Sequence, residues 1–423
     1  MSHDVFRLQS LLLDLLSPIR QIDPAVLRSL DDGEWAAMLE MARQHRVCAL
    51  LHWQARRRGH VLPAPVMDRL GQLSRQHAMR ALTMQRELVL LGRLLREAGI
   101  PFVALKGAYL AFHAYPESRL RPLRDIDILV PHEQVLRAYQ VMLDNGLTRC
   151  PDYPGDPAAA LAASKHLPPL SSASGQAKVE LHDRLFDPSK VRQESIDLAR
   201  TEQFWSRCVD IPVGGEPVRF ESPTDLLLHL IVHAVYDHEF NNGPLLLSDL
   251  AFLLDSRPID WALFWRLAQE GGHTQGCILA LTLTERYWGE KPITWPADAG
   301  GLRAEARARW ESAAALMLQD ISHRGVLGMA NGFAAKAPAE RMKIFWRWIF
   351  PPRTVIAAMY PVREHSARVY LWYAVKWWKM ARRVPAYLGA ARQSGQRGEL
   401  NHVRQLKQWL RAGGQDAGRQ AGH

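Results

Sequence analysis

The segment Arg124–Val130 constrains the fold of this chain more than any other, because polar and apolar residues alternate along it. Side chains on a β-strand point to opposite faces in turn, so Asp125 and Asp127 share one face while Ile126 and Ile128 share the other. The isoleucines would pack against a core and leave two carboxylates side by side. Two such carboxylates repel each other unless a cation lies between them. Oxygen ligands favour Mg²⁺ or Mn²⁺ over zinc, so the pattern predicts a site for one of these ions.

A second segment, Lys178–His182, shows the same alternation, with Val179 and Leu181 on one face and Glu180 and His182 on the other. A turn-rich stretch of serine, alanine and glycine precedes it. We therefore expect a strand that returns beside the aspartate strand and brings Glu180 to the two aspartates. Three carboxylates on neighbouring strands can bind two metal ions about 3.5–4 Å apart, which supports in-line phosphoryl or nucleotidyl transfer.

These features resemble a known superfamily. A glycine turn, then an Asp-x-Asp strand and a lone acid on a later strand are typical of the DNA-polymerase-β-type nucleotidyltransferases. Within it, the chain is similar to bacterial proteins known as uncharacterised nucleotidyltransferases, over about residues 90–260. The segments that resemble them are Leu105–Gly107, Arg121–Val130, Val179–His182 and Leu228–Leu230, with Asp249 and Leu250 further on.

The resemblance implies roles for the residues at matching positions. Gly107 would approach the nucleotide phosphates, Asp125 and Asp127 would hold both metal ions, and Glu180 would complete the shell of the catalytic ion. The three acids are thus implied as catalytic and metal-binding residues, with Mg²⁺ or Mn²⁺ as the cofactor. The chain departs from the superfamily at Ala108, where glycine or serine is usual, and so lacks a hydroxyl that could contact a phosphate.

Three cations near the aspartates have two interpretations each. Lys106 follows a short apolar run and would either neutralise triphosphate charge or solubilise a strand end. Arg121 and Arg124 would either clamp phosphates or compensate the acidic strand. The residues assigned to nucleotide binding are Lys106, Gly107, Ala108, Arg121, Arg124 and His182.

Two further histidines, His229 and His233, lie four residues apart in an apolar segment and so share one face of a predicted helix. The spacing resembles that of a zinc helix, but the glutamate of metalloproteases is missing between them. Histidines in such surroundings are usually hydrogen-bonded core residues. We expect neither to bind zinc, and contact with the substrate stays open.

The motifs together predict an enzyme that moves a nucleotidyl group from an NTP to an acceptor hydroxyl or phosphate. One alternative is a catalytically inactive nucleotide-binding or regulatory module. The other is an antitoxin-like nucleotidyltransferase that modifies a protein side chain. If the enzyme is active, replacing Asp127 with asparagine should abolish turnover and leave thermal stability unharmed or improved, because repulsion between like charges would fall.

The length of 423 residues, with 48% hydrophobic residues, predicts several structural units and ample core. We expect an α+β fold in which a small mixed β-sheet of nucleotidyltransferase type, residues 99–190, is flanked by helical regions. These are an N-terminal region 1–98, a helical domain 191–335 and a C-terminal region 336–423. Apolar spacing predicts helices over 5–16, 33–58 and 67–98. Four separated cysteines, and the lack of an apparent signal peptide or a spanning apolar run, predict a cytoplasmic protein with free thiols.

The C-terminal region differs from the rest in charge. Residues 341–423 contain 16 Lys and Arg against three acids, although the whole chain has a formal charge of only +10. Six tryptophans lie among these cations. The combination suits peripheral binding to an anionic membrane surface first, and a helical cap with a solvated basic face second. Nucleic acid is the third interpretation, through phosphate neutralisation and base stacking.

Overall fold

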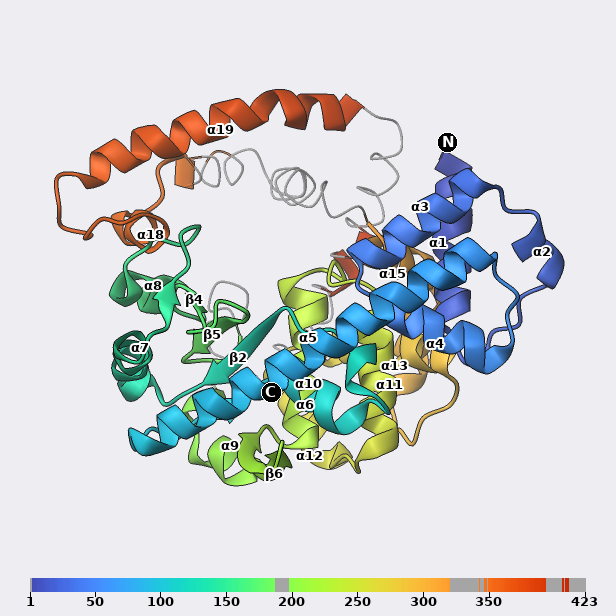
Figure 1. Cartoon of the computed structure of the whole chain (residues 1–423), viewed down its shortest axis with the longest axis horizontal. Helices are drawn as coiled ribbons and strands as arrows, with labels where there is room; N and C mark the ends of the chain where they lie inside the picture. The colour runs from blue at the N-terminus through green and yellow to red at the C-terminus, as the bar shows by residue number, and fades with distance from the viewer. Residues whose placement is uncertain are drawn as a thin grey trace.

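The computed structural model describes residues 2–186, 198–319, 342, 346, 347, 349–392, 405, 406 and 408–410. Five helices precede the sheet, and the last of them, α5, crosses the front of the molecule diagonally (Figure 1). These helices are α1 (Ser2–Leu16), α2 (Pro24–Arg28), α3 (Asp32–Gln44), α4 (Cys48–Arg58) and α5 (Ala64–Glu97).

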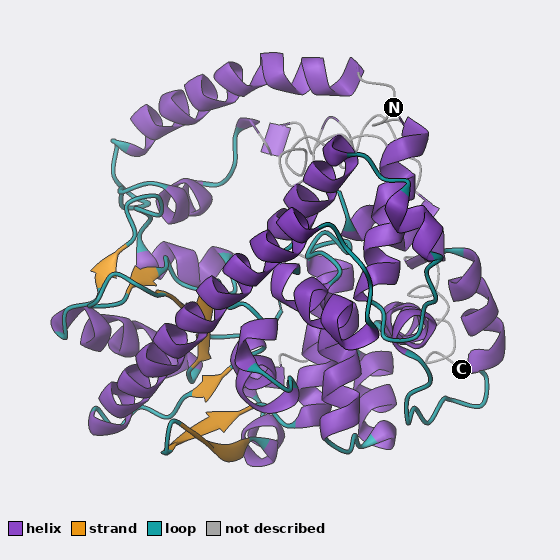
Figure 2. Cartoon of the chain, turned by 45° about the vertical axis from the view of Figure 1, so that its right-hand side comes forward, coloured by secondary structure: helices purple, strands orange, loops and turns teal. Residues whose placement is uncertain are grey.

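A seven-stranded mixed sheet follows, in the order β3-β4-β5-β2-β1-β7-β6. The pairs β2–β5 and β1–β7 are parallel and the remaining neighbours are antiparallel. The expected α+β class, a mixed sheet flanked by helices, is confirmed (Figure 2). The strands are β1 (Val103–Ala104), β2 (Asp125–Leu129), β3 (Thr148–Arg149), β4 (Leu170–Ser171), β5 (Lys178–His182), β6 (Val209–Val213) and β7 (Glu216–Phe220).

Short helices connect the strands, and a helical bundle follows the sheet. Between strands lie α6 (Gly107–Tyr109), η1 (Leu110–Ala114), η2 (Ser118–Leu120), η3 (His132–Gln134), α7 (Val135–Asp144), α8 (Pro157–Ala163), η4 (Leu198–Arg200) and α9 (Glu202–Arg207). After the sheet come α10 (Pro223–Val232), η5 (His233–Asp237), α11 (Leu245–Ser256), α12 (Trp261–Glu270), α13 (Thr274–Trp288), α14 (Ala299–Ala308) and α15 (Trp310–Met317).

One cluster of buried apolar side chains runs from α1 through α5 and the sheet to α13. It includes Leu12, Leu88, Ile128 and Leu281, each almost fully excluded from solvent. The strands β6 and β7 were not predicted, and they extend the sheet beyond residue 190. The boundaries at 98, 190 and 335 stay predictions.

The prediction of a single helix over 33–58 is wrong, because the helix is interrupted between α3 and α4. Arg46 has φ of +60°, in the left-handed region that non-glycine residues rarely adopt. The N–H of Val47 donates to the carbonyl of Ala42 at 2.9 Å, which closes the end of α3 in the manner of a Schellman motif. The break directs Arg46 away from the helix and toward the sheet.

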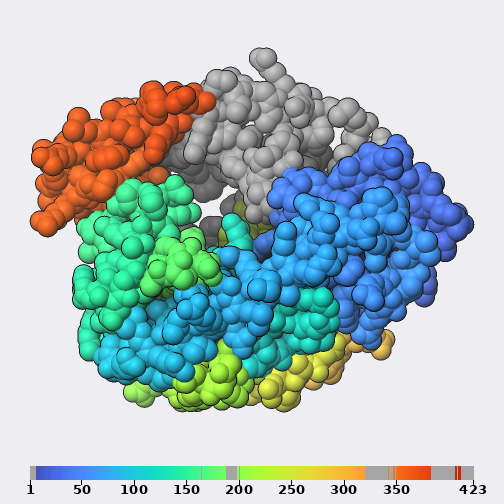
Figure 3. Space-filling model, in the orientation of Figure 1, coloured from blue at the N-terminus to red at the C-terminus, as the bar shows by residue number. Residues whose placement is uncertain are grey.

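Two C-terminal helices, α18 (Arg353–Met359) and α19 (Val369–Arg392), lie at the outer edge of the molecule beside α8 (Figures 1 and 3). Of the tryptophans noted in this region, Trp348 lies outside the described residues. Among the helices that the structure describes, none is long and apolar enough to cross a membrane. The four cysteines are unpaired, as expected.

Candidate functional site

The strands β2 and β5 bring the acidic residues together at one position of the sheet. They pair in parallel with Asp127 directly opposite Glu180, and Asp125 lies one pleat along the same face of β2. The isoleucines of β2 are buried on the other face. The predicted return of the second strand beside the first is confirmed.

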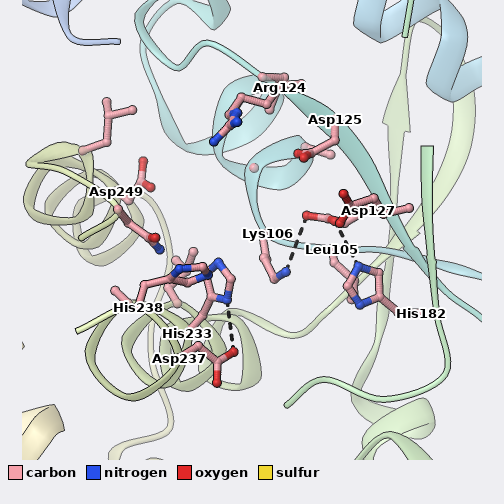
Figure 4. Close-up of a pocket in the computed structure, with 18 of the residues that line it drawn as sticks. Leu105, Lys106, Arg124, Asp125, Asp127, His182, His233, Asp237, His238 and Asp249 are labelled. Carbon is pink, nitrogen blue, oxygen red and sulfur yellow. Dashed lines mark hydrogen bonds and ion pairs between the residues drawn. The ribbon is translucent and has the colours of Figure 1, made fainter. Parts of the chain in front are cut away.

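Of the three carboxylates, Asp127 has its negative charge best stabilised by neighbouring side chains (Figure 4). The Lys106 Nζ atom lies 3.5 Å from its Oδ2, and the His182 Nε2 atom lies 3.0 Å from its Oδ1. Burial opposes ionisation of Asp127, but the Lys106 ammonium and the hydrogen bond from His182 outweigh it, and the pKa of Asp127 lies well below its ordinary value. Burial lowers the pKa of His182 to about 4, so a neutral ring donates its Nε2–H to Asp127.

Neighbouring side chains also stabilise the negative charge of Glu180, whereas the ionised form of Asp125 is disfavoured. Burial and Asp127 oppose ionisation of Glu180, but His166 and a 2.6 Å hydrogen bond from Lys178 bring its pKa below the ordinary value. Burial, followed by repulsion from Asp127 and Glu180, raises the pKa of Asp125 from 3.8 to about 6. The charge that the site disfavours is therefore that of Asp125, whereas Asp127 is paired, so the electrostatics argue against the expectation that Asp127→Asn leaves stability unharmed or improved.

These residues fit a divalent cation. Within the part of the chain that the structure describes, Asp127, Glu180 and His182 each offer a ligand atom, and the three atoms lie within 4.8 Å of one another. Asp125 adds a half-buried carboxylate whose charge a bound cation would compensate. A donor set dominated by carboxylate oxygens suits Mg²⁺ or Mn²⁺.

Lys106 is held in place by its backbone as well as by its ammonium. Its φ of +47° is strained for a residue with a Cβ, and its N–H donates to Glu221 Oε2 at 3.1 Å. The other oxygen of Glu221 lies 2.7 Å from Nδ1 of His229, which is fully buried. His229 is thus the hydrogen-bonded core residue that the sequence suggested, and it fixes the loop that presents Lys106.

The next residue, Gly107, allows a close approach of two loops. A Cβ there would lie 2.8 Å from Leu123 Cδ2 and 3.8 Å from Arg121 Nη1, so a larger residue would push the buried Leu123 side chain aside. Ala108 is buried at the base of the same turn.

A group of guanidinium groups forms one side of the cavity. Arg121 Nε donates to Asp249 Oδ1 at 2.6 Å, and Asp249 also accepts from the Tyr115 hydroxyl at 2.7 Å. The guanidinium of Arg124 turns into the cavity (Figure 4). Arg46, at the break between α3 and α4, joins them, and its burial together with Arg121 and Arg124 lowers its pKa to about 9. It stays charged at neutral pH, so the wall gathers mutually repelling cations that an anion would stabilise.

Arg80, in the middle of α5, supports this wall from behind. Its guanidinium donates to the carbonyls of Leu123, Arg124 and Gln176 at 3.1, 3.1 and 3.3 Å. One side chain therefore fixes both the loop before β2 and the turn before β5.

The opposite wall comes from η5, a π-helical turn, and from the segment after α8. Lys165 Nζ lies 2.7 Å from Asp237 Oδ2 and 3.3 Å from His233 Nδ1. Burial, then Lys106 and Lys165, lowers the pKa of His233 well below its ordinary value, so this ring is neutral. Single π-helical turns are frequent at functional sites, and this one turns His233 and Asp237 toward the cavity (Figure 4).

All the predicted site residues line one cavity of about 480 Å³, a size that suits a small-molecule ligand. They are Lys106, Gly107, Ala108, Arg121, Arg124, Asp125, Asp127, Glu180 and His182. Sequence reasoning missed Arg46, Lys165 and Asp237, and left His233 open. Of these four residues, only His233 and Asp237 had a signal in the sequence, because they continue the four-residue spacing that begins at His229.

The chain matches the family described as "Uncharacterised nucleotidyltransferase" over residues 31–289. Neither curated proteins nor solved structures give a match. The matched range covers more than half of the 423 residues and includes every residue placed in the cavity above. The chain therefore belongs to this family of nucleotidyltransferases, and the membership supports nucleotidyl transfer as its activity.

Proposed function

We propose that the protein transfers a nucleotidyl group from an NTP to an acceptor hydroxyl or phosphate, with Mg²⁺ or Mn²⁺ as its cofactor. The observation that supports this most is the placement of Asp127 opposite Glu180, with the uncompensated Asp125 on the same face of one cavity. The guanidinium wall lies across the same cavity and offers charge for a triphosphate.

In this proposal, Asp125, Asp127 and Glu180 hold the metal. When bound there, a divalent cation supplies neutralisation of phosphate charge and acidification of the acceptor. Arg46 and Arg124 bind the β- and γ-phosphates, because both line the cavity and the guanidinium of Arg124 turns into it (Figure 4). Arg121, fixed by Asp249, orients the wall.

The reaction is a displacement at the α-phosphorus. The acceptor oxygen forms a bond to this phosphorus, and the bond from phosphorus to the oxygen that bridges to the β-phosphate breaks. The bridging oxygen keeps the electron pair and leaves as part of pyrophosphate. Glu180, ionised at neutral pH because its pKa is lowered, accepts the acceptor proton.

The first experiment is isothermal titration of the purified full chain with non-hydrolysable ATP and CTP analogues, with and without Mg²⁺. We expect binding that needs the metal and is lost in Asp125→Ala/Asp127→Ala. Asp68→Asn, an exposed site on α5, is the control for loss of one carboxylate. If the wild-type chain binds no nucleotide, the proposal is refuted.

Turnover is then followed by transfer of label from α-³²P-NTPs to cell extracts and by pyrophosphate release. Transfer that is lost in Asp125→Asn supports the enzyme. Nucleotide binding without transfer or pyrophosphate release would instead favour the inactive, regulatory module. Label on a protein band would assign the acceptor to a side chain.

A further inference from the structure

Helix α19 has one packed face and one apolar face in solvent. On the packed side, Trp372 stacks on Tyr360 at 4.9 Å between ring centroids, and Val369 is buried against them. On the other side, Leu371 and Trp378 are 68% and 58% exposed, and Ala374 lies between them at helical spacing. Large apolar side chains in such a row on a helix surface usually mark an interaction site.

Aromatic side chains extend this face beyond the helix. Trp346, Phe350, Trp377, Tyr373 and Tyr370 form a continuous row in which each ring lies 5.3–6.4 Å from the next. Except for Tyr373, which is half-buried, the members of the row are exposed. Tryptophan and tyrosine are the residues that proteins place at the boundary between water and the lipid headgroups.

The charges in the sequence of α19 have a single sign, and the nearby acid Glu364 accepts a hydrogen bond from Thr354 of α18. The sequence of α19 contains five Lys and Arg and no acidic residue. Arg382 lies 4.6 Å from the ring centroid of Trp378, and Arg353 lies 5.1 Å from that of Tyr370. Arg368 and Lys379 are exposed nearby, and the Lys379 Nζ atom lies 5.2 Å from the ring centroid of Tyr360. Basic residues beside interfacial aromatics match an anionic bilayer surface in both charge and polarity.

We propose that the exposed face of α19, with the aromatic row beside it, docks on an anionic lipid bilayer and holds the protein at the membrane surface. Leu371 and Trp378 insert at the level of the headgroups, and Lys379 and Arg382 contact the lipid phosphates. We define this surface, from Trp346 to Arg382, as the basic aromatic face.

Nucleic acid fits this face less well. Bases stack on open ring faces, but Arg382 covers Trp378 and Arg353 covers Tyr370. Phe350 and Trp377 meet edge to face at 79°, so this pair also covers one ring face. The exposed Leu371 side chain offers a base nothing to stack on, whereas a lipid interface accepts it.

The basic aromatic face is linked to the nucleotidyltransferase cavity. α18, which supports α19, packs on α8, and the N–H of Asp156 donates to the carbonyl of Ala357 at 2.8 Å. The segments on either side of α8 carry Tyr153 and Lys165, which line the cavity. Docking would therefore place the cavity close to molecules in or on the membrane.

The test is co-sedimentation of the full-length protein with vesicles of phosphatidylcholine alone and of equimolar phosphatidylcholine and phosphatidylglycerol, without nucleotide. We expect binding to the anionic vesicles only, weakened by salt. Lys379→Gln/Arg382→Gln should reduce the partition coefficient about thirtyfold, and Leu371→Ser/Trp378→Ser at least about tenfold. Because these side chains are exposed, the variants should keep the wild-type circular dichroism spectrum.

Matched controls are Leu82→Ser and Arg75→Gln on α5, which also alter exposed residues and should bind vesicles as the wild type does. The proposal is overturned if the wild type does not bind anionic vesicles, or if the α19 variants bind these vesicles as well as the controls do. It is also overturned if the protein binds single-stranded RNA more tightly than lipid and the same variants weaken RNA binding. A dimeric wild type that becomes monomeric in these variants would overturn it as well. None of these results depends on nucleotide binding or turnover, so the docking surface and the proposed transferase can fail separately.

Discussion

Replacing Asp125 with asparagine should stabilise the folded protein while it abolishes turnover. The pKa of Asp125 is raised from 3.8 to about 6, so its ionised form is disfavoured in the folded state by up to about 3 kcal/mol. Asparagine keeps the shape of the side chain and removes the cost of burying a charge beside Asp127 and Glu180. At about pH 8 the variant should therefore exceed the wild type in free energy of unfolding by up to about 3 kcal/mol.

The pH dependence checks the cause of this gain. The folded protein keeps the Asp125 proton between pH 3.8 and about 6, whereas the unfolded chain loses it, so wild-type stability falls as pH rises through that window. The advantage of the variant should shrink to about 1 kcal/mol near pH 4.5. Equilibrium urea unfolding at both pH values measures it, with Asp68→Asn as the control. A variant that is no more stable at pH 8, or whose advantage grows in acid, would refute the reasoning.

Other substitutions test the remaining contacts. Asp127→Asn should lower the free energy of unfolding by about 3 kcal/mol in urea, because the buried Lys106 loses its partner; equal stability would contradict the pairing. Arg46→Gln should raise KM for the NTP about tenfold with little change in kcat or melting temperature, since this guanidinium is already repelled by its neighbours. Unchanged KM in steady-state kinetics would exclude it from the triphosphate site. Arg80→Met should speed amide hydrogen exchange in the loop before β2 and lower the free energy of unfolding by about 2 kcal/mol, because three carbonyls lose a donor. Unchanged exchange would show that the loop keeps its structure without Arg80.

The centre of the site could be predicted from the sequence because it depends on local patterns. Alternation in β2 and β5 sets which side chains share a face, and a parallel register with matched polarity then places Asp127 beside Glu180. The glycine turn at Gly107 follows from the short apolar strand before it. The hairpin of β6 and β7 also had a local signal, the glycine pair Gly214-Gly215 between two alternating runs, which the sequence analysis overlooked.

The two walls of the cavity could not be predicted in this way. Arg46 lies at a helix break far before the sheet. Its backbone is left-handed, but the glycine or asparagine that usually predicts this conformation is absent at that position. Lys165 reaches Asp237 across a long stretch of chain, and no periodic pattern encodes that contact. Such side chains meet only because the helices share a core with the sheet, which depends on the packing of the whole chain.

The distribution of charge in the cavity explains how the fold tolerates three neighbouring carboxylates. Two of the three carboxylates have a neighbouring cation or imidazole from the protein itself, so their pKa values stay low. The cost falls on Asp125, where burial and the neighbouring carboxylates together disfavour the ionised form by up to about 3 kcal/mol, a modest fraction of the stability of a folded chain. A cation that binds there removes this cost, and the free energy it recovers adds to the affinity of the site. This cost is small enough for the proposed metal site to stay folded without a cation.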